Sequence, residues 1–593
     1  SSILTVLFLP MAPGLERAQR LATQLVSGGA STAVPRHFDV PPGSDDAELA
    51  GHLRWMAQKM ELGQDMLLLG PPGSLRRQLA LRFCELQGRE AEVLTVTRDT
   101  TEADLKQRRE LSRSSGGRTI YADSAPVRCA LRGRVLVLDG LEKAERNVLP
   151  TLNNLLENRE MQLDDGRLLI PARRYDVLTQ EEISVEEGKA KLVRVHADFR
   201  VVALAVPSPP WPGNPLDPPL RSRFQARIIM PPNLVSAVQL QPFFHLPSNV
   251  AELETLLRRL TALHRALEQG QMPGGLRTPT LTYDAIARLL RLVLHPSEIR
   301  PTPGEALHRV YPVGLLVANG KTAVRDATEQ LLRHFDLAEE PRAMSVSPIS
   351  SSSTTGMVQL QLSEGTASAV ISVPSLKLPA PDVSARPFVT SKALDALLAR
   401  LVQDFASGSD CLLVGPAGCG KSAMARHLAA LMGHGAPGGL GLEFFFLHEE
   451  MSSRDLLQRR ATSDQGDTIW MDSPLVRAAR SGAMCILDGA HRLKGDALCA
   501  LAPLLQDRQA CLSVAGDPRG ATWELLLRSD RFQAQGEQSF DAAAGCLVAP
   551  IHPSFKVLAL AEAPTTQNLW LTEEVSASFA THSYPDQKLE DLV

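Results

Sequence analysis

The segment from Cys411 to Leu428 constrains the fold of this chain more than any other stretch. It reads CLLVGPAGCGKSAMARHL, in which an apolar strand-like run meets a glycine-rich turn and then a helix-forming run. The turn satisfies every position of the pattern GxxxxGK[ST], and a strand before and a helix after it are the context that this pattern requires. The segment therefore predicts a phosphate-binding loop between a strand and a helix.

The residue types of this loop indicate what it binds. Glycines let successive backbone N–H groups point at an anion, and the N-terminus of the following helix adds positive potential. Lys421 is expected to reach the β- and γ-phosphates of a nucleotide, and Ser422 to complete the oxygen shell of a Mg²⁺ ion. A chance glycine-rich turn would need neither residue. The predicted nucleotide-binding residues are Gly415, Pro416, Ala417, Gly418, Cys419, Gly420, Lys421 and Ser422.

Length and composition limit the remaining possibilities. A chain of 593 residues is too long to fold around a single hydrophobic core, so roughly three or four domains are expected. No segment has the roughly 18 uncharged apolar residues of a membrane span, so no transmembrane segment is predicted. A net charge of -4 offers no cationic excess to displace counterions from nucleic acid, so non-specific nucleic-acid binding is not expected.

The eight cysteines show neither a CxxC pair nor metal-ligand spacing, which predicts buried thiols in a reducing compartment. Cys419 lies inside the loop. It could act as a redox switch, but we favour the interpretation that it only provides a small side chain beside phosphate. The opening run SSILTVLFLPMAPG has no basic flank before it and fits a buried strand better than a signal peptide. The missing initiator Met suggests a fragment.

The pattern of the loop and its neighbours occurs earlier in the chain in altered form. The earlier loop begins at Gly70 and lacks the last glycine and the metal-binding hydroxyl. Contact between Arg76 and a phosphate stays an open alternative. The last three positions of this loop hold Leu75, Arg76 and Arg77. Two more pairs of runs match, DLKQRR with DLLQRR and TIYADS with TIWMDS, and the interval from Thr119 to Asp139 equals that from Thr468 to Asp488. We infer an internal repeat.

Each copy then has an apolar run that closes on an aspartate, VLVLD at Asp139 and CILD at Asp488. Asp488 would emerge beside the phosphate loop and serve as a second Mg²⁺-side ligand. Further buried strands are expected at residues 199–206 and 555–562, and the alternation of strands with helices predicts parallel sheets. Arg223, in the run LRSRF, either meets a nucleotide held by a neighbouring module or lies on an ordinary surface.

The chain divides into units of different pattern. Amphipathic helices from Ala251 to Leu337 predict a lid, SVSPISSSSTT from Ser345 to Thr355 predicts a flexible linker, and residues 358–362 and 370–373 predict a hairpin. The chain ends about 30 residues after Glu562 without another arginine, so we expect a truncated second module. The expected units are an N-terminal segment (1–45), a first α/β domain with a degenerate loop (46–232), a lid (233–343), a linker with a hairpin (344–385) and a second α/β domain (386–593).

A phosphate loop, an Asp-terminated strand, a third buried strand, an arginine pair and a helical lid, in that order, resemble an AAA+ ATPase module, here present twice. The runs DTTEADLKQRREL, EKAERNVLPTLNNLLENREMQLDDGR and GNPLDPPLRSRFQAR are similar to the MoxR and dynein-related branch, from about residue 46 onward. The resemblance implies tandem α/β modules, each a parallel sheet flanked by helices, with a helical lid after the first. It also implies a mitochondrial, ring-forming mechanoenzyme that uses ATP and Mg²⁺ and assembles with itself or with adjacent AAA+ modules.

Members of the resembled family also carry a further AAA+ module and a von Willebrand A domain with a metal-ion adhesion site. Neither has room in this chain, so metal-dependent adhesion is not predicted. The client protein is not indicated.

Two departures from the family pattern bear on catalysis. The family usually follows its strand aspartate with a glutamate that polarises water, whereas Gly140 and Gly489 stand here, and its sensor asparagine is replaced by Val206 and Glu562. Asp488, with Arg223 at the arginine-finger position, is the catalytic pair that the resemblance implies, and Glu562 is one substitute base. An ATPase is favoured, and the alternative is a scaffold that binds ATP without hydrolysing it. A GTPase or nucleotide kinase would need a base-specificity motif that is not found.

Overall fold

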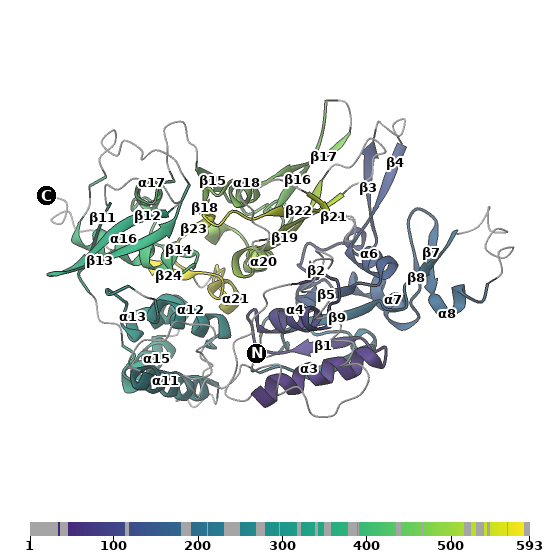
Figure 1. Ribbon diagram of the computed structural model, residues 1–593, viewed down its shortest axis with the longest axis horizontal. Coiled ribbons are helices and arrows are strands. Elements are labelled where there is room, and N and C mark those ends of the chain that lie inside the picture. The colour runs from purple at the N-terminus through teal and green to yellow at the C-terminus, as the bar shows by residue number, and fades with distance from the viewer. Residues whose placement is uncertain are drawn as a thin grey trace.

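The computed structural model divides the chain into two α/β modules and a helical domain that lies between them in the sequence (Figure 1). The residues that it describes are 34–35, 46–112, 118–178, 191–209, 211–230, 250–268, 279–295, 297–316, 322–338, 342–348, 357–376, 388–389, 391–434, 441–464, 467–514, 523–528, 539–541, 546–565 and 567–585. The predicted N-terminal strand within residues 1–14 lies outside these ranges.

A five-stranded parallel sheet forms the centre of the first module. Its strand order is β10-β1-β9-β5-β2, and every neighbouring pair is parallel. The runs MLLL, VLVLD and RVVALA are almost continuously apolar because helices cover both faces of a parallel sheet. The strands are β1 (Met66–Leu69), β2 (Ala91–Thr95), β5 (Val135–Asp139), β9 (Arg200–Ala205) and β10 (Gln225–Ile228).

The second module repeats this arrangement. Its sheet has the order β15-β18-β23-β14-β24, so the strands occupy the same places, by their order along the module, as in the first sheet. All of its neighbouring pairs are parallel, which confirms the predicted fold class. The strands are β14 (Cys411–Val414), β15 (Leu442–Phe446), β18 (Met484–Asp488), β23 (Lys556–Ala561) and β24 (Ala580–Ser583). The last strand, β24, was not predicted.

Helices cover both faces of each sheet, and each sheet separates two apolar cores. In the second module Leu412 and Leu487 face one core, whereas Leu413 and Ile486 face the other, as the alternation of side chains along a strand requires. The longer helices are α3 (Asp46–Glu61), α4 (Leu75–Gln87) and α6 (Ala125–Arg132) in the first module, and α16 (Lys392–Ala406), α17 (Lys421–Leu431) and α18 (Pro474–Ser481) in the second.

Shorter elements complete both modules. The first has α5 (Glu102–Leu105), η1 (Leu141–Lys143), η2 (Leu149–Leu152), α7 (Asn153–Glu157), α8 (Ala172–Tyr175), α10 (Pro218–Arg221), and a sheet of β6 (Met161–Gln162), β7 (Arg167–Pro171) and β8 (Lys191–Val195). The second has η5 (Ala490–Arg492), α19 (Gly495–Cys499), α20 (Ala502–Gln506), α21 (Glu573–Ser576), and a sheet of β19 (Gln509–Val514), β20 (Trp523–Arg528), β21 (Ser539–Asp541) and β22 (Cys546–Pro550).

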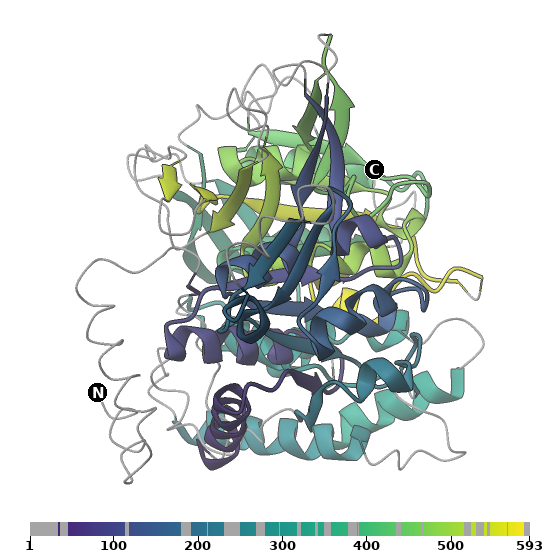
Figure 2. The ribbon, with the colours of Figure 1, turned by 90° about the vertical axis from the view of Figure 1, so that its right-hand side faces the viewer.

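Two β-hairpins, one from each module, extend side by side from the body of the molecule (Figure 2). They are β3 (Gln107–Ser112) with β4 (Arg118–Asp123), and β16 (Gln458–Thr462) with β17 (Thr468–Asp472). Trp470 Nε1 donates a hydrogen bond of 3.2 Å to Glu110 Oε1, and the Arg108 guanidinium lies 5.6 Å from the centre of the Trp470 ring. The matching runs of the two copies thus form equivalent hairpins that contact each other.

The helical segment between the modules, predicted as a lid, has five helices in its described residues, and these pack around their own apolar core. Figure 1 shows these helices below the sheet of the second module, and α13 packs against β24. The first lid therefore contacts the second module as well as the first. The helices are α11 (Val250–Glu268), α12 (Tyr283–Val293), α13 (Pro303–Val310), α14 (Val313–Leu316) and α15 (Thr322–His334).

The prediction of a flexible linker from Ser345 to Thr355 is wrong for its first residues. Strand β11 (Ser345–Pro348) pairs antiparallel with β12 (Met357–Glu364), which pairs with β13 (Ala367–Pro374) as the predicted hairpin. The sheet packs on α16, so cross-strand hydrogen bonds and this contact outweigh the serine-rich composition. Residues 349–356 lie outside the described ranges.

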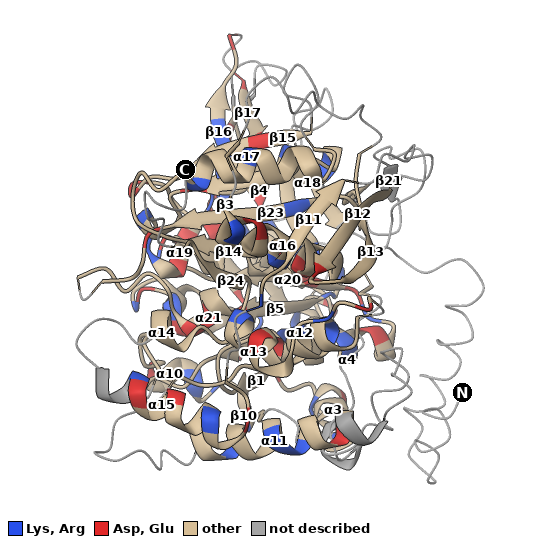
Figure 3. Cartoon of the chain, turned by 90° about the vertical axis from the view of Figure 1, so that its left-hand side faces the viewer, with Lys and Arg blue, Asp and Glu red and all other residues tan. Residues whose placement is uncertain are grey.

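Two of the described cysteines are accessible at the surface, and charges of both signs are mixed on one side of the molecule. No helix among the described residues combines the length and apolarity needed to cross a bilayer. Basic and acidic residues are interspersed on the side that Figure 3 shows. Five described cysteines are buried, but Cys511 is exposed and Cys419 partly exposed, so the prediction of buried thiols fails at these two positions. Cys511 lies on a strand whose alternate residues face solvent.

Candidate nucleotide-binding site

The loop from Gly415 to Ser422 joins β14 to α17 at the carboxyl end of the second sheet. This is the edge where open parallel sheets bind ligands. Gly418 and Gly420 have φ angles of 75° and 100°, in the left-handed region that glycine adopts without strain. A Cβ atom added at Gly418 would meet no atom within 4 Å, and residues 416–418 are exposed. The concave side of the loop is therefore open to solvent.

Lys421, the first residue of α17, lies across this loop. Its ammonium group donates hydrogen bonds of 2.8 Å to Gly415 O and 2.6 Å to Pro416 O, and lies 3.9 Å from Cys419 Sγ. The side chain is only partly buried. The positive charge thus lies over the loop, where the phosphates of a nucleotide would be bound.

Ser422 and Asp488 meet at the base of the loop, as predicted. Ser422 Oγ donates a hydrogen bond of 3.0 Å to Asp488 Oδ2, although 66 positions separate the two residues. A hydroxyl and a carboxylate side by side are oxygen donors of the kind that Mg²⁺ prefers. With the open loop next to them, these two residues fit a Mg²⁺ ion that also binds phosphate oxygens.

Tyr584 packs against the loop and was not predicted to belong to the site. It follows β24, and its backbone N–H donates a hydrogen bond of 2.7 Å to Val414 O. A Cβ atom at Gly415 would lie 2.6 Å from Tyr584 Cβ, and one at Gly420 would lie 3.1 Å from the phenol oxygen. The tyrosine therefore requires glycine at both positions. No local pattern in the sequence distinguishes it, because it is more than 160 residues away from the loop.

In both modules the residue after the strand-ending aspartate, Asp139 or Asp488, is a glycine with a left-handed backbone conformation. Gly140 and Gly489 have φ angles of 90° and 92°. A Cβ atom at Gly489 would lie 3.2 Å from Leu447 O and 3.2 Å from Arg492 Cδ. The backbone conformation and the lack of space thus both oppose a glutamate here.

His491 and Glu562 form a pair near Asp488. His491 Nδ1 accepts a hydrogen bond of 3.1 Å from the Glu562 backbone N–H, and its Nε2 lies 3.5 Å from Glu562 Oε1. Burial lowers the pKa of His491, and the charge of Glu562 opposes this shift. The Glu562 side chain, the predicted substitute base, is 44% exposed and faces the histidine.

The earlier loop, in the first module, makes the same contacts with different residues. Arg76 Nη1 donates to the carbonyls of Gly70 and Pro71, the counterparts of the two carbonyls that Lys421 binds. Arg77 Nη1 donates a hydrogen bond of 2.9 Å to Asp139 Oδ2, as Ser422 does to Asp488. Both arginine side chains are buried. Arg76 is thus buried against its own loop, whereas Lys421 makes the same contacts and stays partly exposed.

Arg77 also reaches the second module. Its Nε donates a hydrogen bond of 2.6 Å to Asp507 Oδ2, and its Nη2 one of 2.7 Å to Gln506 Oε1. Burial lowers the pKa of Arg77, but the charges of Asp507 and Asp139 outweigh it and keep the guanidinium protonated. Arg77, the last residue of the first loop, is therefore buried between the two modules.

Arg223, the predicted finger, binds groups of its own module. Its Nε donates a hydrogen bond of 3.2 Å to Asn153 O, its Nη1 donates to Pro219 O, and its Nη2 forms an ion pair with Glu157. The side chain is 19% exposed at the surface of the module. Arg223 thus forms its hydrogen bonds and its ion pair within its own module.

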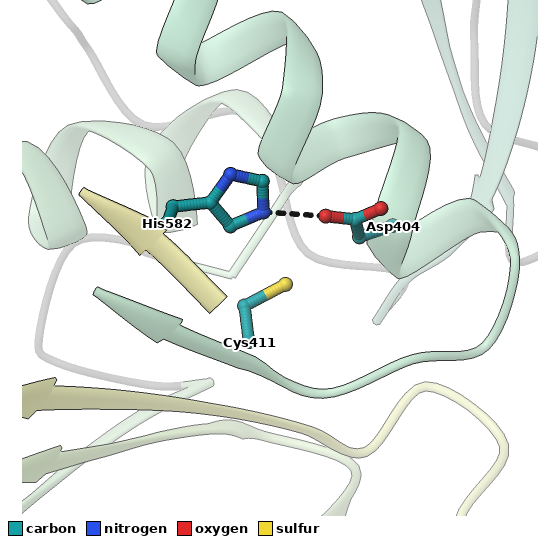
Figure 4. A group of neighbouring side chains, drawn as sticks. All are labelled: Asp404, Cys411 and His582. Atoms are coloured by element: carbon teal, nitrogen blue, oxygen red, sulfur yellow. Dashed lines mark hydrogen bonds and ion pairs between the residues drawn. The ribbon is translucent and has the colours of Figure 1, made fainter. Parts of the chain in front are cut away.

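Asp404, Cys411 and His582 form a buried group whose ligating atoms lie within 4.8 Å of one another (Figure 4). His582 Nε2 donates to one Asp404 oxygen, and Arg309 Nη1 of the lid lies 3.2 Å from the other. Burial raises the pKa of the Cys411 thiol, which stays protonated. The cationic Arg309 and the neutral thiol both oppose a metal ion, so this group fits a junction between the lid and the second module.

Comparison with known proteins identifies the type of module. The model of the AAA domain, dynein-related subfamily, matches residues 65–224 and 410–574. The mouse von Willebrand factor A domain-containing protein 8 is 40% identical over 94% of this chain, which spans 28% of that relative. Protein NorQ of Paracoccus denitrificans is 31% identical over 28% of this chain and 51% of its own length. The denitrification regulatory protein NirQ of Stutzerimonas stutzeri is 36% identical over 18% of this chain and 36% of its own.

Proposed function

Because the matched stretches cover more than half of its residues, the chain belongs to the dynein-related subfamily of AAA domains, and we propose that its second module binds Mg-ATP. The backbone N–H groups of the loop and Lys421 would hold the phosphates, and Ser422 and Asp488 would hold the metal ion. When bound, Mg²⁺ would neutralise charge on the phosphates. The first module takes no part in this binding.

One contrast carries the proposal. In the second module the loop is open at Gly418, with Lys421 over it and the Ser422–Asp488 pair at its base. In the first module Arg76 and Arg77 take the places of Lys421 and Ser422, and both arginines are buried, whereas Lys421 and Ser422 are partly exposed. An anion can therefore approach only one of the two loops without displacing protein groups.

Whether the bound ATP is hydrolysed depends on what replaces the glutamate after Asp488. In an ATPase, Glu562 with His491 would hold the attacking water and accept its proton, because the two side chains face each other beside the site. The alternative is a scaffold that holds ATP without turnover. Gly489 favours this alternative, because it has no side chain to accept a proton and its left-handed conformation disfavours a glutamate at the usual position.

ATP binding to the purified chain tests the assignment. With Mg²⁺ present, we expect one ATP per chain and loss of binding in Lys421→Ala, because that ammonium is the only side-chain cation on the open loop. Arg76→Ala is the matched variant of the first loop and should leave the dissociation constant within about twofold, a shift of under 0.5 kcal/mol. Isothermal titration of the three proteins decides the point, and equal loss in both variants would contradict it.

Steady-state phosphate release separates the two forms of the proposal. An ATPase should release phosphate faster than Lys421→Ala and lose this rate in Glu562→Gln. If the parent chain releases phosphate no faster than Lys421→Ala, the result supports the alternative, a scaffold that binds ATP without hydrolysing it.

Assembly and location are further proposals that rest on the family. We propose a ring in which Arg223 faces the nucleotide of a neighbouring module, and a mitochondrial location. Sedimentation with and without ATP would test the ring, since a monomer under both conditions contradicts it.

Fractionation of cells tests the mitochondrial location, and recovery of the protein outside mitochondria would rule it out.

A further inference from the structure

A carboxylate from the lid covers the phosphate-binding loop of the first module. Asp284, the second residue of α12, accepts a hydrogen bond of 2.8 Å from the Ser74 backbone N–H through its Oδ2, and its Oδ1 accepts from Ser74 Oγ. A Cβ atom at Gly73 would lie 2.8 Å from Asp284 Oδ2, whereas at the aligned Gly418 nothing lies within 4 Å. Ser74 and Asp284 are buried. An anion of the protein itself thus lies on the first loop.

A cation of the protein lies next to the metal-side aspartate of the same pocket. Arg77 stands where the second module has Ser422, and it binds Asp139, the counterpart of Asp488, at 2.9 Å. Asp507 of the second module binds the same guanidinium at 2.6 Å. The side chains of Arg77 and Asp507 are about 5% exposed. Solvent ions therefore have little access to this pair.

We infer that the first module carries an internal substitute for a metal–phosphate ligand: Asp284 takes the place of a phosphate on the loop, and Arg77 takes the place of the metal ion beside Asp139. Loops of this type bind anions through backbone N–H groups and helix dipoles, and a carboxylate satisfies those groups as a phosphate does. The inference concerns the first module and holds whether or not the second module hydrolyses ATP.

This internal ligand joins three parts of the molecule. Asp284 belongs to the lid, Ser74 and Arg77 belong to the first α/β domain, and Asp507 belongs to the second module. Arg288, one turn after Asp284 on α12, adds a hydrogen bond to the carbonyl of Ala577 in the second module. A nucleotide that binds between a domain and its lid closes them only while it is bound. Here the closing groups are part of the chain, so the first module stays closed at every nucleotide concentration.

Chemical rescue tests the inference in the full-length chain. Lys421→Ala is used as the background, so that the second loop binds no anion. Asp284→Ala should raise amide exchange in peptides covering residues 70–87 and 283–293 on the order of tenfold, because a charge-assisted hydrogen bond is lost. Inorganic phosphate should then restore the protection, because it can occupy the position of the missing carboxylate. Potassium chloride at equal ionic strength should not.

Two matched variants define the result. Asp284→Asn keeps the side-chain volume, so its exchange should not respond to phosphate. Asp326→Ala removes an exposed carboxylate from α15 of the lid and should leave the first loop unchanged. The inference is overturned if Asp284→Ala exchanges like its parent, or if phosphate fails to restore protection. If Asp284→Ala does not fold, Ser74→Ala removes the hydroxyl donor instead and must raise exchange in the same peptides. ATP binding through Lys421 is measured separately, so failure of one proposal leaves the other standing.

Discussion

Gly489 illustrates how one residue sets the chemistry that the second module can perform. Its φ of 92° costs a residue with a side chain about 1–2 kcal/mol. The sequence predicted the loss of the usual glutamate here, and it predicted Lys421, Ser422 and Asp488 as neighbours. It did not predict that the backbone conformation would disfavour a glutamate, because a glycine adopts positive and negative φ angles about equally readily.

We expect that Gly489→Ala lowers the free energy of unfolding of the second module by at least about 1–2 kcal/mol. The neighbouring Leu447 carbonyl, 3.2 Å from the new Cβ, should add to this loss. Gly408→Ala is the matched control, because Gly408 has a φ of 80° but no atom within 4 Å of its Cβ position. Thermal denaturation of both variants gives the difference. Gly489→Glu should not increase phosphate release, and a stable, faster variant would contradict this account.

At the scale of elements, helix α13 of the lid is fixed to α16 of the second module by buried charges. Arg309 Nη1 lies 3.2 Å from Asp404 Oδ1, and its Nη2 donates a hydrogen bond of 2.9 Å to Gln403 Oε1. Burial raises the pKa of Asp404, but Arg309 and His582 outweigh it and keep the carboxylate charged. The helices themselves were predicted from their amphipathic patterns. Their contact with the second module was not.

Arg309→Ala should destabilise this junction by about 3–5 kcal/mol, because it leaves a buried carboxylate without its cation. Arg259→Ala is the control, since its ion pair with Asp336 on the same lid is exposed and worth at most about 1 kcal/mol. Denaturant unfolding of the full chain, followed by tryptophan fluorescence, measures both losses. Similar losses in the two variants would show that Arg309 does not hold the lid.

At the scale of the whole molecule, polar contacts hold the two modules together. Lys143 Nζ lies 2.6 Å from Glu574 Oε1, Thr97 Oγ1 lies 3.0 Å from Ser453 Oγ, and Arg454 pairs with Asp104. With the lid packed against both modules, these contacts predict that the modules unfold together.

Glu574→Lys should uncouple the modules, because it places a second ammonium group against Lys143, whose side chain is 8% exposed, and like charges in such a contact cost several kcal/mol. In calorimetry we expect a shared transition of the parent chain to separate into two. Asp326→Lys, which reverses an exposed charge on α15 of the lid, should leave the transition intact. An unchanged thermogram for Glu574→Lys would mean that other contacts suffice.

The sequence by itself determined the two phosphate loops, the strands that end at Asp139 and Asp488, and the meeting of Ser422 with Asp488. These follow from short contiguous patterns, and the carboxyl ends of parallel strands necessarily share one edge of the sheet. Only the tertiary structure decided that Tyr584 packs on the open loop, that Asp284 covers the closed one, and that Arg77 binds Asp507. Each of these contacts joins residues more than 160 positions apart. Their approach depends on how separately folded units pack, which no local pattern encodes.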